Sequence, residues 1–106
     1  MNNILFICSK NKWRSPTAEA IFRRDCRMNV RSAGTSQKAK RTVSEKDIMW
    51  ADIIFVMEKK HKQRLIAQFS GIFGQKDLIT LDIPDEYQFM DVELVELLKD
   101  GVEPYI

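Results

Sequence analysis

A cysteine and an arginine near the N-terminus have the types and the spacing of a phosphoryl-transfer site. Five residues separate them in the segment Cys8-Ser-Lys-Asn-Lys-Trp-Arg14-Ser15. A cysteine thiolate is a nucleophile, and the planar guanidinium of arginine binds two phosphate oxygens at once, which a lysine ammonium cannot do. The pair therefore indicates phosphoryl transfer through cysteine.

The segments on both sides of this pair predict a loop that joins a strand to a helix. The apolar run Ile4-Leu-Phe-Ile7 precedes Cys8 and predicts a strand over residues 3–8, whereas Ser15-Pro16 is typical of a helix cap followed by proline at the first helical position. Backbone N–H groups in such a loop can converge on one anion, and the positive end of the helix dipole adds to them. The same positive field favours the thiolate form of the cysteine.

The residues after Pro16 predict a helix over residues 16–26. Apolar side chains recur there at helical spacing, at Ala18, Ile21, Phe22 and Cys26. We therefore expect Cys26 to be a small core residue on the buried face of this helix.

The length and composition are typical of one small soluble domain over residues 1–106. Hydrophobic residues make up 44% of the 106 residues and charged residues 30%. We find no apolar run of membrane-spanning length and no signal-peptide pattern, so we expect a cytoplasmic protein that does not bind membranes. The two cysteines form no CxxC or Cys/His cluster, and we expect neither a metal nor a cofactor.

The single histidine, His61, lies among charged residues. Glu58, Lys59, Lys60 and Lys62 surround it in the sequence. This pattern predicts a solvated helix surface, and we expect no catalytic role for His61.

Charge is distributed unevenly along the chain. Residues 1–41 hold ten Lys or Arg against two acidic residues, which gives +8, and residues 42–106 hold seven against thirteen, which gives −6. The basic part contains the Cys8 loop and would attract anionic substrates.

Strand and helix patterns alternate along the whole chain, which predicts an α/β protein with a parallel sheet. The expected strands cover residues 3–8, 29–32, 52–57 and 77–81, and the expected helices cover residues 16–26, 44–50, 58–69 and 91–99. Ligands of such sheets bind beyond the carboxyl ends of the strands. The acidic loop of residues 82–86 should therefore lie opposite Cys8.

An ordered set of short motifs resembles the low-molecular-weight protein tyrosine phosphatase family. The motifs extend over nearly the whole chain and are Phe6-Ile7-Cys8-(x5)-Arg14-Ser15-Pro16, Ala18-Glu19-Ala20, Ser32-Ala33-Gly34-Thr35, Ala51-Asp52 with the following apolar strand, and Ile83-Pro84-Asp85-Glu86-Tyr87. The resemblance implies a four-stranded parallel sheet in the order 2-1-3-4, flanked by helices.

The resemblance also implies the catalytic roles. Cys8 would attack phosphorus, Arg14 would hold the phosphoryl oxygens, and Asp85 would protonate the leaving oxygen and later activate water. Asp82 is the alternative acid, and we prefer Asp85 because it stands in the matching Ile-Pro-Asp-x-Tyr run.

Further residues would bind substrate or support the loop. By the same resemblance, Asn11 and Ser32 would share a hydrogen-bond network, and Ser15 would stabilise the thiolate. The residues that we expect to contact substrate are Ser9, Lys10, Asn11, Lys12, Trp13, Ser15 and Tyr87.

The chain departs from the family pattern inside the loop itself. Lys10 stands in place of a glycine, Lys12 in place of an apolar residue, and Trp13 in place of a second cysteine. We infer a more open and more basic mouth than that of a typical phosphotyrosine pocket, with Trp13 and Tyr87 as the remaining aromatic wall.

We consider four functions for these residues. The first is a metal-independent cysteine phosphatase of phosphotyrosine or another phosphomonoester, with a phosphorylated protein or a small ester as partner. The second moves the same chemistry to nucleotide or RNA phosphates, although the pattern does not favour nucleic-acid binding. The third is a non-catalytic phosphate-binding or regulatory module. The fourth, arsenate reduction by a disulfide relay, requires later cysteines, and none follows Cys26. The sequence does not determine the oligomeric state.

Overall fold

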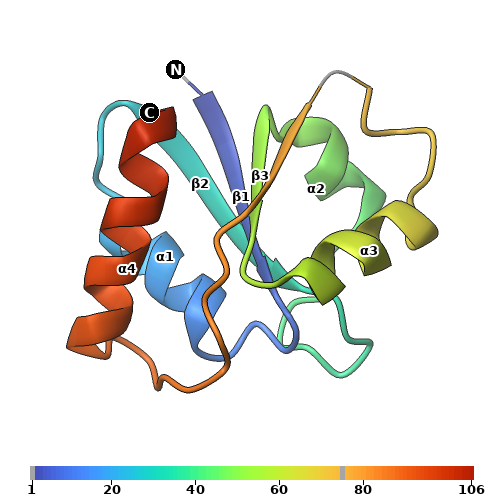
Figure 1. The fold of residues 1–106 in the computed structure, drawn as a ribbon. Coiled ribbons are helices and arrows are strands. Elements are labelled where there is room, and N and C mark those ends of the chain that lie inside the picture. Colours follow the sequence, from blue (N-terminus) through green and yellow to red (C-terminus); the bar gives the residue numbers. More distant parts are fainter. Residues whose placement is uncertain (1, 75) are drawn as a thin grey trace.

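Four parallel strands form the central sheet of the computed structural model, which describes residues 2–74 and 76–106 (Figure 1). The strands lie in the order β2-β1-β3-β4, as expected. Their bounds are β1 Asn2–Cys8, β2 Met28–Gly34, β3 Ile53–Val56 and β4 Asp77–Thr80.

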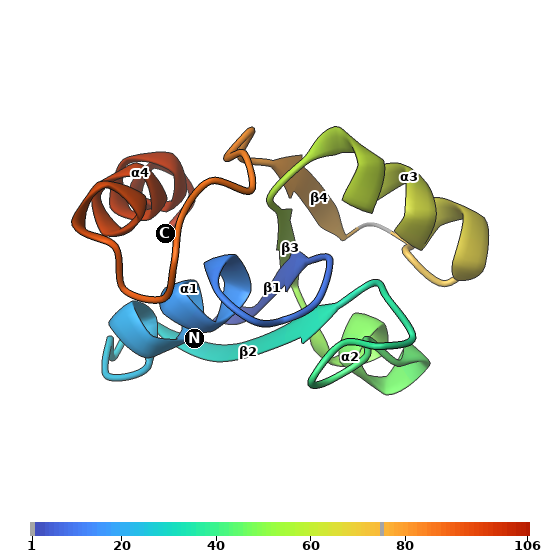
Figure 2. The ribbon, with the colours of Figure 1, turned by 90° about the horizontal axis from the view of Figure 1, so that it is seen from below.

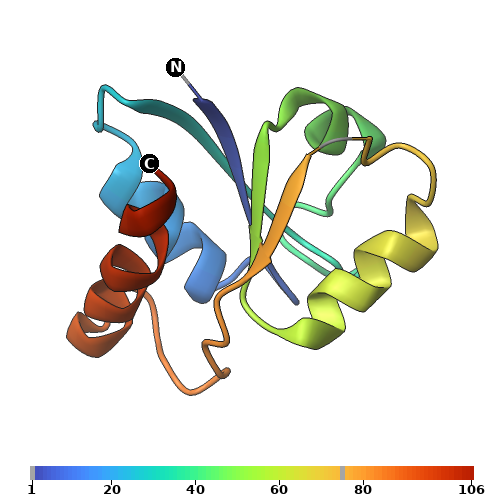
Figure 3. The ribbon, with the colours of Figure 1, turned by 45° about the horizontal axis from the view of Figure 1, so that its top comes forward.

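Helices cover both faces of the sheet. On one face lie α1 (Arg14–Phe22) and α4 (Val92–Val102), the latter followed by a 3-10 turn at Glu103–Tyr105. On the other face lie α2 (Glu45–Trp50) and α3 (Lys59–Gln68), as Figure 3 shows. Within the two described ranges, no helix has the length and apolar character needed to span a membrane.

Alternate side chains of β1 point into two separate apolar cores. Ile4, Phe6 and Cys8 face the core beneath α1 and α4, whereas Leu5 and Ile7 face the core beneath α2 and α3. Both faces of this strand are buried, which explains its continuous apolar sequence.

The register brings the carboxyl ends of the strands to one edge of the sheet. Cys8 pairs with Gly34 on β2, and Val56 of β3 pairs with Ile7 on one side and Thr80 on the other. The loops that follow β1, β2, β3 and β4 therefore start close together, which is the usual place for a ligand in an open parallel sheet.

The predicted helix over residues 16–26 is wrong at both ends. Helix α1 starts at Arg14 and ends at Phe22, so Ser15 lies inside it and does not cap it. Beyond Phe22 the chain turns, and there Arg27 donates from Nε to Asp25 Oδ1 and from Nη2 to Asp25 Oδ2. Cys26 lies in this turn and is exposed, contrary to the expectation that it belongs to the core.

Candidate active site

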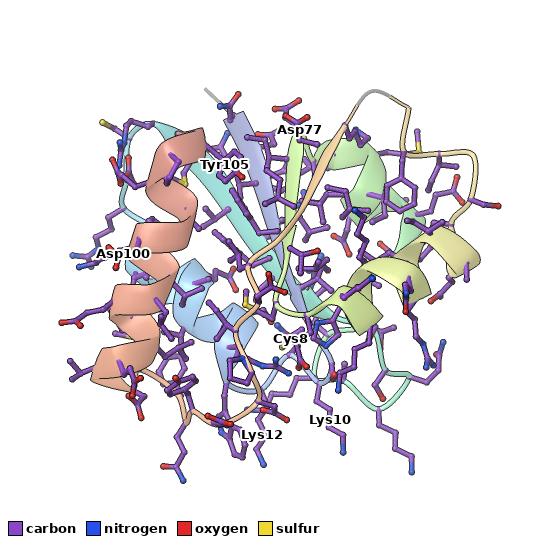
Figure 4. All side chains as sticks on the ribbon, in the orientation of Figure 1. Cys8, Lys10, Lys12, Asp77, Asp100 and Tyr105 are labelled. Carbon is purple, nitrogen blue, oxygen red and sulfur yellow. The ribbon has the colours of Figure 1, made fainter. Side chains whose placement is uncertain are left out.

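A cleft of about 400 Å³ opens at the carboxyl edge of the sheet. Figure 2 shows the ribbon from below, with this edge of the sheet toward the reader. In Figure 4 Cys8 lies at this end of the strands, and Lys10 and Lys12 extend beyond it, away from Asp77 at the opposite end. The residues that line the cleft are Cys8, Ser9, Lys10, Lys12, Trp13, Arg14, Lys60 and Asp85.

The Cys8 thiol lies at the base of this cleft and is 3% exposed. Its Sγ is 3.0 Å from the Ser15 hydroxyl oxygen, and Asn11 Nδ2 donates to the same oxygen at 2.9 Å. Asn11 occupies a lone pair of that oxygen, so the single hydroxyl hydrogen of Ser15 can point to the sulfur at 3.0 Å or to the Ala33 carbonyl at 3.4 Å. Ser15 can thus stabilise a negative charge on Cys8.

The loop between Cys8 and Arg14 has the features of an anion cradle. Among the residues that the structure describes, no acceptor is recorded for the backbone N–H groups of residues 9–13. Asn11 has a φ of 51°, in the left-handed region that asparagine adopts more readily than most residues. These N–H groups remain available to a bound phosphoryl group.

Polar side chains beneath the loop hold it in shape. Asn11 Nδ2 also donates to the Ser32 hydroxyl at 3.0 Å, and Ser32 in turn donates to Glu19 Oε1 at 2.5 Å. Asn11, Ser15 and Ser32 are buried. The side chains of Asn11 and Ser15, which we expected to contact substrate, therefore bind other parts of the protein beneath the cleft.

The segment after β2 packs directly against the cradle. Thr35 N–H donates to the Cys8 carbonyl at 3.0 Å, and Ser36 N–H donates to the Ser9 carbonyl at 2.9 Å. A Cβ at Gly34 would lie 2.5 Å from the Ser9 carbonyl oxygen, closer than real Cβ atoms approach. Glycine is therefore required where β2 meets the loop.

The Arg14 guanidinium is fixed from two sides and is 2% exposed. It donates to a carboxylate oxygen of Glu58 and to the carbonyl of Ile83, the latter at 2.8 Å. Burial raises the pKa of Glu58, but the hydrogen bond and charge of Arg14 outweigh it, so the pKa lies below its ordinary value. Glu58 is thus a carboxylate partner that orients Arg14 toward the cleft.

Asp85 faces the cleft from the loop after β4. Its Oδ1 is 3.7 Å from Arg14 Nε, and its side chain is 58% exposed. Asp82, the alternative acid, lines a different hollow beside Lys59 and Lys62 of α3. The geometry therefore brings Asp85 to Cys8 and leaves Asp82 outside.

The expectation that His61 lies on a solvated surface is wrong. The ring is 1% exposed, its Nδ1 accepts the Glu58 backbone N–H at 3.0 Å, and its Nε2 is 2.8 Å from the Ser9 hydroxyl oxygen. Because Nδ1 is an acceptor, the neutral ring carries its hydrogen on Nε2 and donates it to Ser9. Burial, followed by the charge of Arg14, lowers the pKa of His61 to about 4.

The first turn of α3 therefore supports the cradle through two residues that we did not assign from the sequence. Glu58 holds Arg14 and His61 holds Ser9. One signal was available: Glu58 stands two residues after the end of β3, at the carboxyl edge, and caps α3. His61 is three residues further on, at the position whose side chain reaches back to the cap residue. The lysines around His61 conceal this pattern.

Only one of the two expected aromatic residues reaches the cleft. Trp13 lines it, and the Lys12 ammonium lies 4.7 Å from the centre of the Trp13 ring. Tyr87 is not among the described residues that line the cleft; its ring packs on the core and its hydroxyl donates to Glu93 at 3.3 Å. The aromatic wall is smaller than expected.

The cleft thus combines a thiol, unpaired N–H groups, a buried guanidinium and a carboxyl group. In the described part of the chain, no group of three or more His, Cys, Asp or Glu side chains is arranged to hold a metal ion. The set can bind a tetrahedral oxyanion, attack it and supply a proton.

Comparisons with known proteins find similar sequences and similar folds. The profile of the low molecular weight phosphotyrosine protein phosphatase family matches residues 3–49. A protein-arginine-phosphatase from Bacillus subtilis is 32% identical over 94 residues, covering 63% of each chain. The chain therefore spans less than two thirds of that relative.

Solved structures share the whole fold. A YwlE mutant from Bacillus subtilis is 26% identical with a TM-score of 0.73, covering 98% of both chains. A low molecular weight protein tyrosine phosphatase from Streptococcus pyogenes is 18% identical with a TM-score of 0.80, covering all of this chain and 94% of that one. Together with the motifs around Cys8, these matches show that the chain is similar to low-molecular-weight protein tyrosine phosphatases and shares their fold.

Proposed function

We propose that this protein is a cysteine-dependent phosphatase of phosphomonoesters. The Cys8 thiolate attacks phosphorus, an S–P bond forms, and the P–O bond to the leaving group breaks. Asp85 transfers its proton to the departing oxygen, so the alcohol or phenol leaves neutral. Arg14 and the backbone N–H groups bind the oxygens of the phosphoryl group and stabilise the charge that develops on them.

The second step releases phosphate and restores the enzyme. Asp85, now a carboxylate, accepts a proton from a water molecule, and the water oxygen attacks the phosphocysteine. The new P–O bond forms as the S–P bond breaks, which yields inorganic phosphate and the Cys8 thiolate. The hydrogen bond from Ser15 makes the thiolate a better leaving group, because it stabilises the charge on sulfur.

One observation supports catalysis above all: Asp85 and Arg14 converge on the cleft whose base is the Cys8 thiol. A module that only binds phosphate would need the loop and Arg14. It would gain nothing from a carboxylate beside the anion, which repels it. Asp85 therefore favours an enzyme over a binding module.

The charges around the cleft bear on the leaving group. The curated relative is named a protein-arginine-phosphatase. The leaving group of phosphoarginine is arginine, whose guanidinium is cationic after the phosphoryl group has been transferred. Lys10, Lys12 and Lys60 line this cleft and would repel a cation. We therefore propose oxygen esters as substrates.

Among oxygen esters we propose phosphotyrosine first, because the ring of Trp13 offers a wall for an aromatic leaving group. A phosphorylated nucleotide is the second candidate. The three lysines at the mouth support it, because their positive charge would attract an anionic leaving group but not a neutral phenol.

The decisive assay is release of phosphate from a small aryl phosphate without added metal. We expect turnover that Cys8→Ser abolishes, whereas Cys26→Ser, which changes the exposed second cysteine, serves as the matched control and retains it. Equal turnover by Cys8→Ser and the unchanged protein would refute the mechanism. Absence of turnover in the unchanged protein, with phosphate still bound, would favour the binding module.

A further inference from the structure

We propose that a second anion-binding subsite lies beside the cleft and selects phosphomonoesters that carry a second phosphate on the leaving-group side; this inference rests on the proposed function. The subsite is a hollow of about 300 Å³. The residues that line it are Ser9, Thr35, Ser36, Lys60, His61 and Arg64. We call it the Arg64 subsite.

Two cations of the Arg64 subsite lack strong protein partners. Lys60 and Arg64 are four residues apart on α3, which places them on the same face of the helix. In the described ranges Arg64 forms no ion pair. The carboxylate near Lys60 belongs to Glu58, at 3.9 Å, and Arg14 already binds it more closely. Both cations are therefore available to an anion.

Hydroxyl groups supply hydrogen-bond donors in the same hollow. Ser9 Oγ accepts the hydrogen of His61 Nε2, so its own hydrogen is free to point elsewhere. Ser36 Oγ accepts the Lys38 backbone N–H at 3.0 Å, which likewise leaves its hydrogen free. Donors without acceptors beside two cations are typical of phosphate recognition.

No carboxylate of the described residues lines the Arg64 subsite. The cleft with Cys8, in contrast, contains Asp85. A second phosphate in the subsite would thus meet only cations, hydroxyl groups and the neutral ring of His61. The lining of the subsite therefore attracts an anion and contains no negative charge that would repel it.

Continuity with the cleft identifies this anion as part of the substrate. Ser9 and Lys60 line both the cleft and the Arg64 subsite. A single small ligand can therefore place one phosphoryl group over Cys8 and a second anionic group between Lys60 and Arg64. A monophosphate would leave the subsite to solvent and gain nothing from it.

Binding to the Cys8→Ala protein, which has no nucleophile at the base of the cleft, tests the subsite independently of catalysis. We would measure Kd by calorimetry for adenosine 3′,5′-bisphosphate and for the two adenosine monophosphates that carry only one of its phosphates. We expect the bisphosphate to bind about ten-fold more tightly than either monophosphate, as two charge-assisted contacts allow. Arg64→Gln in the same background should remove most of this difference.

Lys62→Gln is the matched control, because Lys62 lies on α3 but lines neither the cleft nor the Arg64 subsite. It should leave the ratio of the Kd values unchanged. Equal Kd values for bisphosphate and monophosphates, or an equal loss in Lys62→Gln and Arg64→Gln, would overturn the proposal. Absence of aryl phosphate turnover in the unchanged protein would instead refute the proposed function, and the two failures are thereby distinguished.

Discussion

The loop after β1 and the loop after β4 meet over the same cleft but are built in opposite ways. In the first, Cys8, Asn11 and Arg14 are buried and Asn11 is hydrogen-bonded to residues from α1 and β2. In the second, Asp85 is mostly exposed, and its recorded polar contact is an ion pair of 3.7 Å with Arg14. The groups that we propose to bind phosphate are preorganised, whereas the proposed proton donor is held loosely at the edge.

The ends of the second loop are nevertheless anchored. Ile83 N–H donates to the Met57 carbonyl at 2.8 Å, and Met90 N–H donates to the Thr17 hydroxyl at 2.9 Å. Between these anchors the side chain of Asp85 can move without breaking core contacts. Substitutions in the first loop should therefore change both stability and activity, and a substitution at Asp85 should change activity alone.

Arg14→Lys should produce the largest effect among the remaining substitutions. Arg14 contacts both Glu58 and Ile83 through Nη1, which leaves its other guanidinium nitrogens for the phosphoryl oxygens. A lysine has one nitrogen for all of these partners and no planar fork, so it must give up phosphate contacts or protein contacts. We expect kcat/KM for an aryl phosphate to fall about 10³-fold, the scale of a lost oxyanion donor, together with a lower urea midpoint. Steady-state kinetics measures the first effect and urea unfolding the second. An unchanged midpoint would contradict the claim that substitutions in the loop after β1 lower stability.

Asp85→Asn should have the next largest effect on activity. The amide cannot donate the proton that the leaving oxygen needs, so kcat should fall about 10²-fold. The urea midpoint should stay within error of the unchanged protein, since the side chain is exposed. Asp82→Asn is the matched control in the same loop, and a larger kcat loss there would reverse the assignment of the acid.

The buried ring of His61 should make stability depend on pH. Its pKa is about 4 in the folded protein and near 6.5 when unfolded. Between these values the unfolded chain binds more protons, so the free energy of unfolding falls as pH is lowered from about 6.5 toward 4. Urea unfolding at pH 7.5 and pH 4.5 should show a loss larger by about 2 kcal/mol in the unchanged protein than in His61→Gln. Equal losses would show that His61 is not buried in its neutral form.

The activity of His61→Gln should be reduced about ten-fold, less than that of Asp85→Asn. His61 positions Ser9 and touches no reacting atom, so its loss loosens one end of the cradle. We expect KM to rise more than kcat falls, because phosphate binding depends on the loop. His61→Asn, which is too short to reach Ser9, should be at least as impaired. A pure kcat effect would argue for a direct chemical role.

Tyr87→Phe should have the smallest effect. The Tyr87 hydroxyl contacts Glu93, and its ring packs on the core instead of lining the cleft. Kinetics with an aryl phosphate should differ less than about two-fold from those of the unchanged protein. Trp13→Ala gives the comparison, and a greater loss of kcat/KM in Tyr87→Phe would restore Tyr87 to the substrate wall.

Features that depend on residues close in sequence could be predicted, whereas features that depend on contacts between distant residues could not. The strand before Cys8 follows from an apolar run that is local in sequence. The order of the strands is implied by the family resemblance, and the structure confirms it. Helix α1 ends before Cys26 because Asp25 and Arg27 pair in a turn, which periodicity alone does not reveal. Glu58 and His61 gain their roles from contacts across about fifty residues of chain.

Trapping the phosphocysteine tests the account most directly. We would mix the Asp85→Asn protein with an aryl phosphate, stop the reaction with denaturant and determine the mass of the peptide that contains Cys8. Asp85→Asn should slow hydrolysis of the intermediate, so we expect a phosphoryl group on Cys8 and none on the Cys26 peptide. A phosphoryl group on another residue, or an unmodified Cys8 peptide while phosphate is released, would contradict the central claim.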